Sequence, residues 1–407
     1  MADGRLLLVL PLRIYNVGGR FFTDTQACNG LRLWLDNFSC VTLAGPSETV
    51  AHAPPDTSPI DAISGFDNLT VLPLPLAYLP HRFTAALPKT IKLLKANIAK
   101  ADYLQFAIGG LWGDWASVGC IIAQQMKLPY AVWTDHVESQ VAEFQGKSKH
   151  GLRRIYALAN ATLMRRYERY LVGHAALGLF NGMDCYDAYA KYCSNSHVVH
   201  DVHLASSARI SDQELEKRLS RQPGPLRLAY AGRVHLDKGV FDWIEALTTA
   251  AREQVDFEAT WYGGGPQLEA ARDRVRQLAL SARISFPGSL ERSDLLRELR
   301  VADAFVFCHK TPESPRCLIE ALMCGLPIIG YDSSYPKDLI RNGGGMLSQA
   351  NDPRLIARSL VAIQNRSALS DLSRRAMADG RKFTDEGVFR HRSVLMKTIR
   401  VDARLRT

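Results

Sequence analysis

The sequence has no long apolar run: none approaches the roughly 18 uninterrupted residues that a membrane-spanning helix requires. It also lacks low-complexity tracts and internal repeats, which excludes fibrous and repeat architectures. Its eight cysteines form no CxxC pair and no His/Cys cluster at zinc-ligand spacing, so we expect a reducing compartment. The apolar N-terminal stretch is short, follows Asp3 and Arg5, and has no small-residue cleavage site. We therefore expect a cytoplasmic protein without a signal peptide.

The net charge indicates which partners the protein can have, and the length indicates how many domains it has. The 50 Lys and Arg residues outnumber the 41 Asp and Glu residues, giving a net charge of +9. This balance favours acidic partners such as nucleotides, phospholipid head groups or nucleic acid. At 407 residues the chain exceeds the roughly 250–300 residues at which single cores stop growing, so two domains of about 200 residues are expected.

Short apolar runs alternate with helical patterns along both halves of the chain. Most runs are continuous, as in strands of a parallel sheet covered on both faces. In the first half they are residues 6–12, 40–45, 69–76, 103–109, 129–135 and 175–182, with helical periodicity at 24–35 and 87–100. After a loop at 221–226 they are residues 226–232, 257–265, 283–289, 303–309 and 326–332. The alternation predicts two doubly wound α/β domains joined near 201–225, with the substrate in the cleft between them.

Two cations flank a loop that follows the strand at 226–232. Gly232 ends the strand, and Arg233 and Lys238 precede the helix that Gly239 opens. Glycine allows a close backbone approach, while an arginine fork and a lysine point charge suit a diphosphate. From this motif alone, a solvated polar loop is an equally good interpretation.

The segment TPESPRCLIEALMCGLPIIG places Glu313 in a loop after an apolar strand and Glu320 on the helix that follows. Helix-entry amides near 315–317 suit an anion. A carboxylate there can accept hydrogen bonds from sugar hydroxyls, worth about 1.5–3 kcal/mol each. Two acids stabilised by the helix dipole, for a few tenths of a kcal/mol, are the alternative. Spacing does not decide between the two.

The motifs AGR-x4-KG, YGGGP, FPGSL and ADAFVF…PES…LIEALMCGLPIIGYD, in this order, resemble the retaining glycosyltransferases of family 4. The resemblance covers about residues 226–345 well and the whole chain loosely. It implies the GT-B fold, an α/β architecture of two Rossmann-like doubly wound domains facing a central cleft. An acceptor-side domain (1–205), a nucleotide-sugar-binding domain (206–385) and a helix crossing back to the first domain (386–407) are expected. The implied donor substrate is a UDP- or GDP-type sugar, and since no Asp-x-Asp site is evident, no metal is expected.

The resemblance assigns roles to individual residues. Arg233 and Lys238 would bind the diphosphate and stabilise its charge as it leaves. Glu313 would face the donor sugar and Glu320 would hold the ribose hydroxyls, although six residues separate them here instead of the family's seven. The remaining implied donor contacts are Gly232 beside the phosphates, the backbone near Leu290 at the nucleobase, and the segment with Ser314, Arg316 and Cys317. Pro315 and Arg316 replace a glycine-rich turn, so this loop is reshaped.

Three residues of the first half complete the expected site. Gly18 and Gly19 match the family's first strand-to-helix turn, where glycines let a helix N-terminus approach the donor phosphate; packing is the alternative. His136 follows the strand at 129–135, where cleft residues belong, and would orient the sugar or acceptor; a structural histidine is the alternative. By resemblance, the acceptor attacks on the face that the diphosphate leaves, and a diphosphate oxygen takes its proton.

Two basic stretches, 88–100 and 147–171, suit an anionic membrane surface or a solvated helix face. The expected function is the transfer of a sugar, with retention of configuration, to a saccharide or lipid-linked acceptor, as in surface-polysaccharide assembly. If the protein binds the membrane, it is expected as a peripheral protein on the inner face. Nucleic acid is not expected as a partner. A transferase for a small natural product, a non-catalytic GT-B binding protein and a sugar-nucleotide epimerase are the alternatives.

Overall fold

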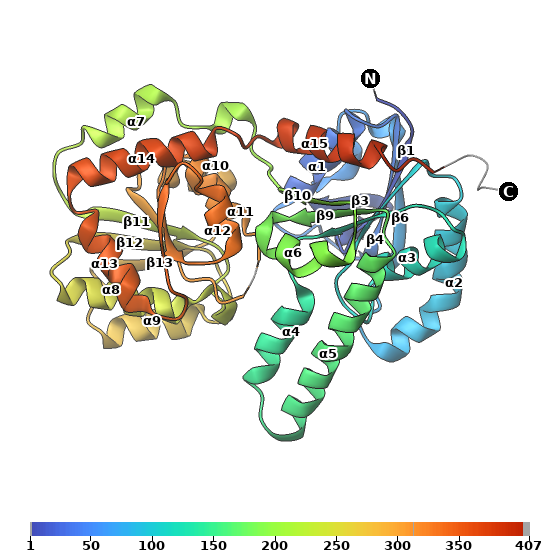
Figure 1. Cartoon of the computed structure of the whole chain (residues 1–407), viewed down its shortest axis with the longest axis horizontal. Coiled ribbons are helices and arrows are strands. Elements are labelled where there is room, and N and C mark those ends of the chain that lie inside the picture. The colour runs from blue at the N-terminus through green and yellow to red at the C-terminus, as the bar shows by residue number, and fades with distance from the viewer. Residues whose placement is uncertain (1, 312, 402–407) are drawn as a thin grey trace. The chain divides into compact units, whose positions relative to one another are not determined.

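The computed structural model of the chain describes residues 2–311 and 313–401. It has two compact units: residues up to 203 with those from 385 on, and residues 204–384 (Figure 1). The expected boundaries were 205/206 and 385/386. Pro312 of the PES motif and residues 402–407 of the expected terminal helix lie outside the described residues. No helix of the described part is long and apolar enough to cross a bilayer.

The first unit is built on a ten-stranded sheet whose main part is parallel. Its strands follow the order β10-β9-β8-β7-β1-β4, and β6 also pairs with β4. Their bounds are β1 (Arg5–Val9), β4 (Cys40–Thr49), β6 (Leu69–Pro75), β7 (Tyr103–Ala107), β8 (Ala131–Thr134), β9 (Leu177–Asn181) and β10 (Ser196–Val199). Along β1, Leu6 and Leu8 enter one core cluster and Leu7 and Val9 the other. Burial on both faces explains why these strands read as continuous apolar runs.

Helices cover both faces of this sheet. They are α1 (Thr25–Leu35), α2 (Pro80–Ile98), α3 (Trp115–Gln125), α4 (Glu138–Lys147), α5 (Gly151–Gly173), α6 (Gly182–Tyr189) and α15 (Asp385–Lys397). The side chain of Asp24 caps α1 by accepting hydrogen bonds from two backbone amides of its first turn. The C-terminal helix α15 packs on α1, where the rings of Phe389 and Trp34 lie 5.3 Å apart. The chain thus returns to its first unit after completing the second.

The expectation for Gly18 and Gly19 was structurally wrong. They form the two-residue turn between the antiparallel strands β2 (Ile14–Val17) and β3 (Arg20–Asp24), not a strand-to-helix turn. Both glycines have positive φ, 59° and 93°, as a tight hairpin turn demands. The hairpin adds β2, β3 and β5 (Thr57–Pro59) to the edge of the sheet beyond β4. The helix α1 begins only after this hairpin.

The second unit has a six-stranded, fully parallel sheet in the order β13-β12-β11-β14-β15-β16. The strands are β11 (Leu226–Ala231), β12 (Phe257–Tyr262), β13 (Ile284–Gly288), β14 (Ala304–Phe307), β15 (Ile328–Tyr331) and β16 (Gly345–Ser348). The helices are α7 (Asp212–Leu219), α8 (Val240–Arg252), α9 (Leu268–Gln277), α10 (Arg292–Val301), α11 (Arg316–Met323), α12 (Ser334–Leu339), α13 (Pro353–Ala362) and α14 (Arg366–Gly380). Strand order reverses between β11 and β14, and ligands of open α/β sheets bind at such a point.

Candidate functional site

The loops after β11 and β14 lie side by side at the reversal point of the second sheet. The backbone N–H of Lys310 donates to the carbonyl of Asp237 at 2.8 Å, which ties the two loops together. Gly239, with φ of 69°, makes this approach possible because a Cβ there would lie 1.9 Å from the Cys308 carbonyl oxygen. A single ligand at this edge can therefore contact both loops.

Arg233 is the exposed cation of the first loop. Its side chain makes no hydrogen bond or ion pair with any described residue, and it follows Gly232 directly. Nearby, His235 and Asp237 contact each other through a ring nitrogen and a carboxylate oxygen. Burial alone would raise the pKa of Asp237, but Lys238 and His235 outweigh it and lower that pKa. Asp237 is therefore ionised and pairs within the loop, and the guanidinium of Arg233 can bind an anionic ligand.

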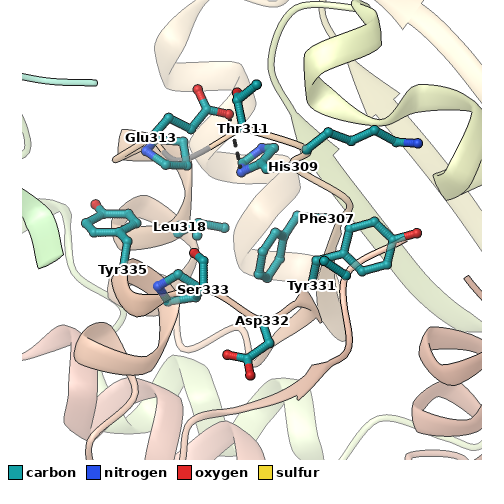
Figure 2. Close-up of a pocket in the computed structure, with 13 residues that line it drawn as sticks. Phe307, His309, Thr311, Glu313, Leu318, Tyr331, Asp332, Ser333 and Tyr335 are labelled. Carbon is teal, nitrogen blue, oxygen red and sulfur yellow. Dashed lines mark ion pairs between the residues drawn. The ribbon is translucent and has the colours of Figure 1, made fainter. Parts of the chain in front are cut away.

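Glu313, in the second loop, lies at the rim of a pocket at the carboxyl ends of β14 and β15 (Figure 2). Its carboxylate forms an ion pair with Lys238 from the first loop, and both side chains are largely buried. The structure thus brings together the residue expected at the donor sugar and one expected at the diphosphate. In this state each neutralises the other.

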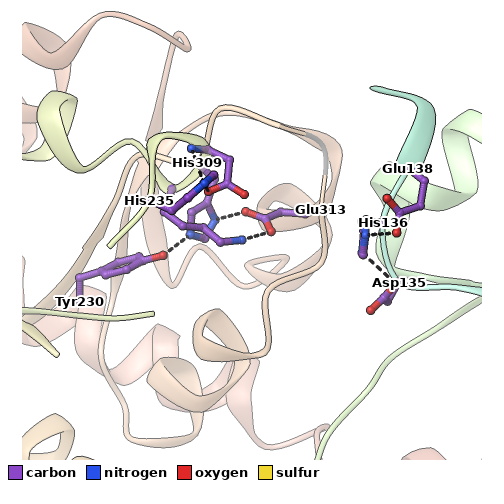
Figure 3. Close-up of polar contacts among 9 residues, drawn as sticks. Asp135, His136, Glu138, Tyr230, His235, His309 and Glu313 are labelled. Atoms are coloured by element: carbon purple, nitrogen blue, oxygen red, sulfur yellow. Dashed lines mark hydrogen bonds and ion pairs between the residues drawn. The ribbon is translucent and has the colours of Figure 1, made fainter. Parts of the chain in front are cut away.

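A buried chain of contacts continues from Glu313 to the core (Figure 3). His309 places Nδ1 3.7 Å from Glu313 Oε1, and its Nε2 lies 2.7 Å from the hydroxyl of Tyr230. Burial, aided by the charge of Lys238, lowers the pKa of His309 well below its usual value, so the imidazole is neutral. Burial also raises the pKa of Tyr230, which keeps its hydroxyl proton. We assign that proton to a bond with Nε2, which leaves the Nδ1–H facing Glu313.

Glu320 is buried in α11 and forms an ion pair with Arg292 of α10 at 2.9 Å. Arg292 stands two residues after Leu290, whose side chain is exposed in the loop that follows β13. The expected ribose carboxylate and the expected nucleobase loop are therefore joined through a residue that the sequence analysis did not single out. The signal that could have identified Arg292 in the sequence is its position, as a cationic residue shortly after the FPGSL motif.

The loop between the two carboxylates leads directly into α11. Ser314 is buried, and α11 begins at Arg316, with Cys317 in its first turn. First-turn amides of a helix have no partner within the helix, so they can donate to an anion. Burial raises the pKa of Cys317, which keeps this residue a neutral thiol. Pro315 has no amide proton, and the first two donors are those of Arg316 and Cys317.

His136 lies in the first unit, just after β8 (Figure 3). Its Nδ1 is 2.8 Å from Asp135 Oδ1 and its Nε2 is 2.7 Å from Glu138 Oε1. Burial alone would lower the pKa of His136, but these two carboxylates outweigh it and raise the pKa to about 11. The imidazolium is thus held by its own neighbours. Gly109, in the loop after β7, packs against Glu138, and a Cβ there would lie 3.1 Å from that carboxylate.

The described residues include no group of three or more His, Cys, Asp or Glu side chains that could hold a metal ion. Sequence reasoning placed Arg233, Lys238, Glu313 and Glu320 at one edge of one sheet. The structure pairs Lys238 with Glu313, keeps Arg233 in the loop of Lys238, and pairs Glu320 with Arg292 instead. Sequence reasoning missed His309, Tyr230 and Arg292. His309 ends an apolar strand, where a histidine is easily taken as structural.

Residues 211–382 match the family described as Glycosyl transferases group 1. Over 172 residues, 41% of the chain, the sequence is 31% identical to a glycogen synthase of Mycobacterium tuberculosis. Over 128 residues, 31% of the chain, it is 23% identical to an alpha-monoglucosyldiacylglycerol synthase of Streptococcus pneumoniae. The chain spans 41% and 29% of the lengths of these two relatives.

A solved structure extends the similarity to both units. The chain resembles HepE of Anabaena in complex with UDP-glucose, with a TM-score of 0.67 over 97% of this chain and 100% of that one. The sequence identity is 14%, so the likeness concerns the fold. It confirms the expected fold class, two parallel-sheet α/β domains of the GT-B type.

Proposed function

Because residues 211–382 match the group 1 glycosyl transferases, we propose that this chain transfers a sugar from a nucleotide-diphosphate donor, of UDP or GDP type, with retention of configuration. The observation that carries the proposal is the arrangement at the reversal point of the second sheet. There Arg233, whose guanidinium pairs with no described residue, lies in the same loop as Lys238, which pairs with Glu313. A diphosphate would supply the anionic partner that the guanidinium of Arg233 does not have among the described residues.

In the proposed reaction Arg233 and Lys238 hold the diphosphate and stabilise the charge that develops as it departs. Glu320 accepts hydrogen bonds from the ribose hydroxyls, and Glu313 accepts them from the sugar once Lys238 turns to the phosphates. The acceptor hydroxyl attacks the anomeric carbon on the face that the diphosphate leaves. Its proton passes to a diphosphate oxygen, so no protein base is needed. His136 is a fixed cation that orients the sugar or acceptor, since an imidazolium cannot take a proton.

The test is a panel of UDP and GDP sugars, read by thermal shift and by release of the nucleotide. One donor class should stabilise the protein, and Arg233→Ala should weaken its binding roughly 10- to 100-fold through loss of a charge-assisted bond. Arg252→Ala, at the exposed end of α8, is the matched control and should bind as the wild type does. If no nucleotide sugar stabilises the protein, or if Arg233→Ala binds as well as the wild type, the proposal fails.

We further propose a lipid-linked or membrane-bound saccharide acceptor, as in surface-polysaccharide assembly, reached from an anionic membrane surface. Helix α5, which projects with α4 from the body of the first unit, supports this (Figure 1). Its buried face packs on α4 and the sheet, yet its other face carries large apolar side chains that are at least half exposed: Leu152, Ile155, Tyr156, Leu163 and Tyr170. Exposed arginines flank them: Arg153, Arg154, Arg166 and Arg169. Apolar side chains bordered by cations are typical of a helix that lies in a lipid interface.

Helix α2, the other basic stretch, is different. Its apolar residues Leu94 and Ile98 are fully buried in the core, and Ile91, beside the lysines, is 37% exposed, less than any of the apolar side chains named on α5. Its lysines therefore line a mostly solvated face. Co-sedimentation with vesicles containing anionic phosphatidylglycerol distinguishes the helices. Replacing Leu152, Ile155 and Tyr156 together with serine should abolish a salt-sensitive binding, whereas glutamine at Lys89, Lys92 and Lys95 should leave most of it. No binding by the wild type would favour a small soluble acceptor.

A non-catalytic donor-binding protein is the second candidate. The six-residue spacing of the two carboxylates and the closed pair Lys238–Glu313 favour it. The same panel separates the two functions: this candidate binds a nucleotide sugar but neither hydrolyses nor transfers it with any acceptor.

A further inference from the structure

The segment that carries His136 is anchored by a buried acid of another helix. Helix α4 begins at Glu138, whose carboxylate contacts His136 Nε2 at 2.7 Å (Figure 3). The next residue, Ser139, donates its backbone N–H to Glu168 Oε1 at 2.9 Å, and its hydroxyl donates to Glu168 Oε2 at 2.7 Å. Glu168 belongs to α5 and lies 29 residues further along the chain. Through these two bonds α5 fixes the residue next to Glu138.

The carboxylate of Glu168 replaces a cap that α4 lacks. First-turn amides have no partner within a helix, and an N-cap Ser, Thr, Asp or Asn normally accepts a hydrogen bond from one of them. The N-cap of α4 is Val137, which makes no side-chain cap bond. Glu168 takes over this task from the neighbouring helix, and its negative charge suits the positive end of the α4 dipole. The conformation at the start of α4 therefore depends on α5.

What Glu168 holds, rather than packing, explains why a carboxylate stands at this position. Glu168 is only 4% exposed. Burial raises its pKa, and the charge of Glu138 adds to this, while hydrogen bonds from Ser139 and Tyr189 oppose it. No Lys, Arg or His among the described residues forms an ion pair with it. An apolar side chain would fill the space between the helices without the cost of desolvating a carboxylate.

The same two helices have a second polar contact, away from His136. Arg165 of α5 forms an ion pair with Glu143 of α4, and both side chains are 32% exposed. This pair joins α4 to α5 as Glu168 does, but at the middle of α4 rather than in its first turn. Glu143 is therefore a matched reference for Glu168. Its loss loosens the helix pair without releasing the residues beside His136.

We propose that Glu168 is a positioning residue for the transfer reaction. By fixing Ser139 it fixes Glu138, and Glu138 holds the imidazolium of His136, which orients the sugar or acceptor. The inference rests on the proposed function for the role of His136 in the reaction, whereas the chain of contacts from Glu168 to His136 can be tested without any substrate. Helix α5 then carries both the lipid-facing side chains and the anchor of His136.

Titration of His136 in the full chain tests the positioning. NMR of isotopically labelled histidine follows the imidazole, assigned by the signal that is lost in His136→Gln. Glu168→Ala releases the start of α4, so His136 should lose its proton at a pH at least about one unit lower than in the wild type. Ser139→Ala removes one of the two bonds and should give a smaller decrease, which keeps the test open if Glu168→Ala does not fold. Glu168→Gln can still accept from the Ser139 N–H and should titrate as the wild type does.

Two controls separate positioning from other effects. Glu143→Gln should leave the titration of His136 unchanged, and an equal decrease would reduce Glu168 to a general support of the helix pair. An equal decrease in Glu168→Gln would show a charge effect through space. Either result overturns the proposal. The double variant Glu168→Ala/Glu138→Gln should titrate as Glu138→Gln alone does, because Glu168 acts through Glu138; a further decrease would contradict this route.

Kinetics with the donor found in the panel separate this inference from the proposed function. Glu168→Ala should lower kcat for nucleotide release about tenfold and leave the KM of the donor within twofold, because the proposed diphosphate and ribose contacts lie in the second unit. Glu168→Gln should restore most of kcat. A shifted His136 titration with an unchanged kcat would overturn the part of both residues in the reaction. A chain that binds no nucleotide sugar would overturn the proposed function, while the NMR result would still decide whether Glu168 positions His136.

Discussion

The two units hold their candidate site residues in different ways. In the second unit, ion pairs join residues far apart in the sequence: Lys238 with Glu313, and Arg292 with Glu320. In the first unit, His136 contacts Asp135 and Glu138, its neighbours in the chain. The first arrangement depends on which loops the sheet brings together, and the second depends on one short segment.

This difference indicates how each cluster responds to a ligand. A cation that pairs across two loops can exchange its partner for a phosphate, and the loops can then move. A histidine held on both ring nitrogens by adjacent carboxylates has no such freedom. We therefore expect the second unit to rearrange on donor binding and the His136 cluster to remain as it is.

Lys238→Met gives the largest expected effect, because it removes a cation from both the resting pair and the leaving diphosphate. The kcat/KM for the donor should fall about 100-fold or more, as when one preorganised stabilising group is lost from a transition state. Steady-state kinetics with the donor found in the panel measure it. Lys217→Met, an exposed lysine of α7, is the control and should keep full activity. A decrease below threefold would show that the pair Lys238–Glu313 has no part in the reaction.

Arg292→Ala tests the second pair and should have a smaller effect. Removing Arg292 leaves Glu320 as an unpaired carboxylate near the anionic donor, so the KM of the donor should rise about 3- to 10-fold, with kcat within twofold. The side chain of Arg292 is 30% exposed but that of Glu320 only 11%, so leaving this buried carboxylate without its partner should also cost stability, on the order of 1–3 kcal/mol. Kinetics and urea unfolding on the same preparation measure both. A change in kcat with an unchanged KM would contradict a binding role for Glu320.

Part of this site could be predicted from the sequence, and the reason is topological. Continuous apolar runs predict parallel strands, and polar residues just after such strands meet at one edge of the sheet. Arg233, Lys238 and Glu313 follow this rule. The partner of Glu320 could not be found in this way, because nothing in the sequence shows how closely α10 approaches α11.

The hairpin of Gly18 and Gly19 is a different kind of failure. The signal was present: two glycines flanked by IYNV and RFFTD are typical of a two-residue hairpin turn. The similarity to a glycine-rich strand-to-helix turn outweighed it. Helix α5 shows a third limit, since its basic composition is visible in the sequence but the sequence does not say which face meets the core.

His136 should make stability depend on pH in a way that the second unit's pairs do not. Its pKa is about 11 in the folded chain against 6.5 for an unperturbed histidine. A raised pKa means that the stabilisation is complete below about pH 6.5 and declines as pH rises toward 11. The unfolding temperature of wild type minus that of His136→Gln should therefore shrink steadily between pH 7 and pH 10. His81→Gln, exposed at the start of α2, is the control and should show no such trend. A constant difference across this range would contradict a charged His136.

Removal of divalent metal should have the smallest effect on activity. It tests whether the cations of the second unit bind the donor without a metal ion. We propose that Arg233 and Lys238 together offset the charge of the diphosphate, which is the task a metal ion performs in other transferases. Dialysis against EDTA should then change kcat/KM by less than twofold, and added Mg²⁺ or Mn²⁺ should not increase the rate. In Lys238→Met, by contrast, a divalent ion should restore part of the lost activity, because it supplies the missing positive charge at the same phosphates. A wild-type enzyme that loses its activity in EDTA and regains it with Mg²⁺ would show that the two cations do not suffice. Donor binding would then need a metal in addition to the loops after β11 and β14.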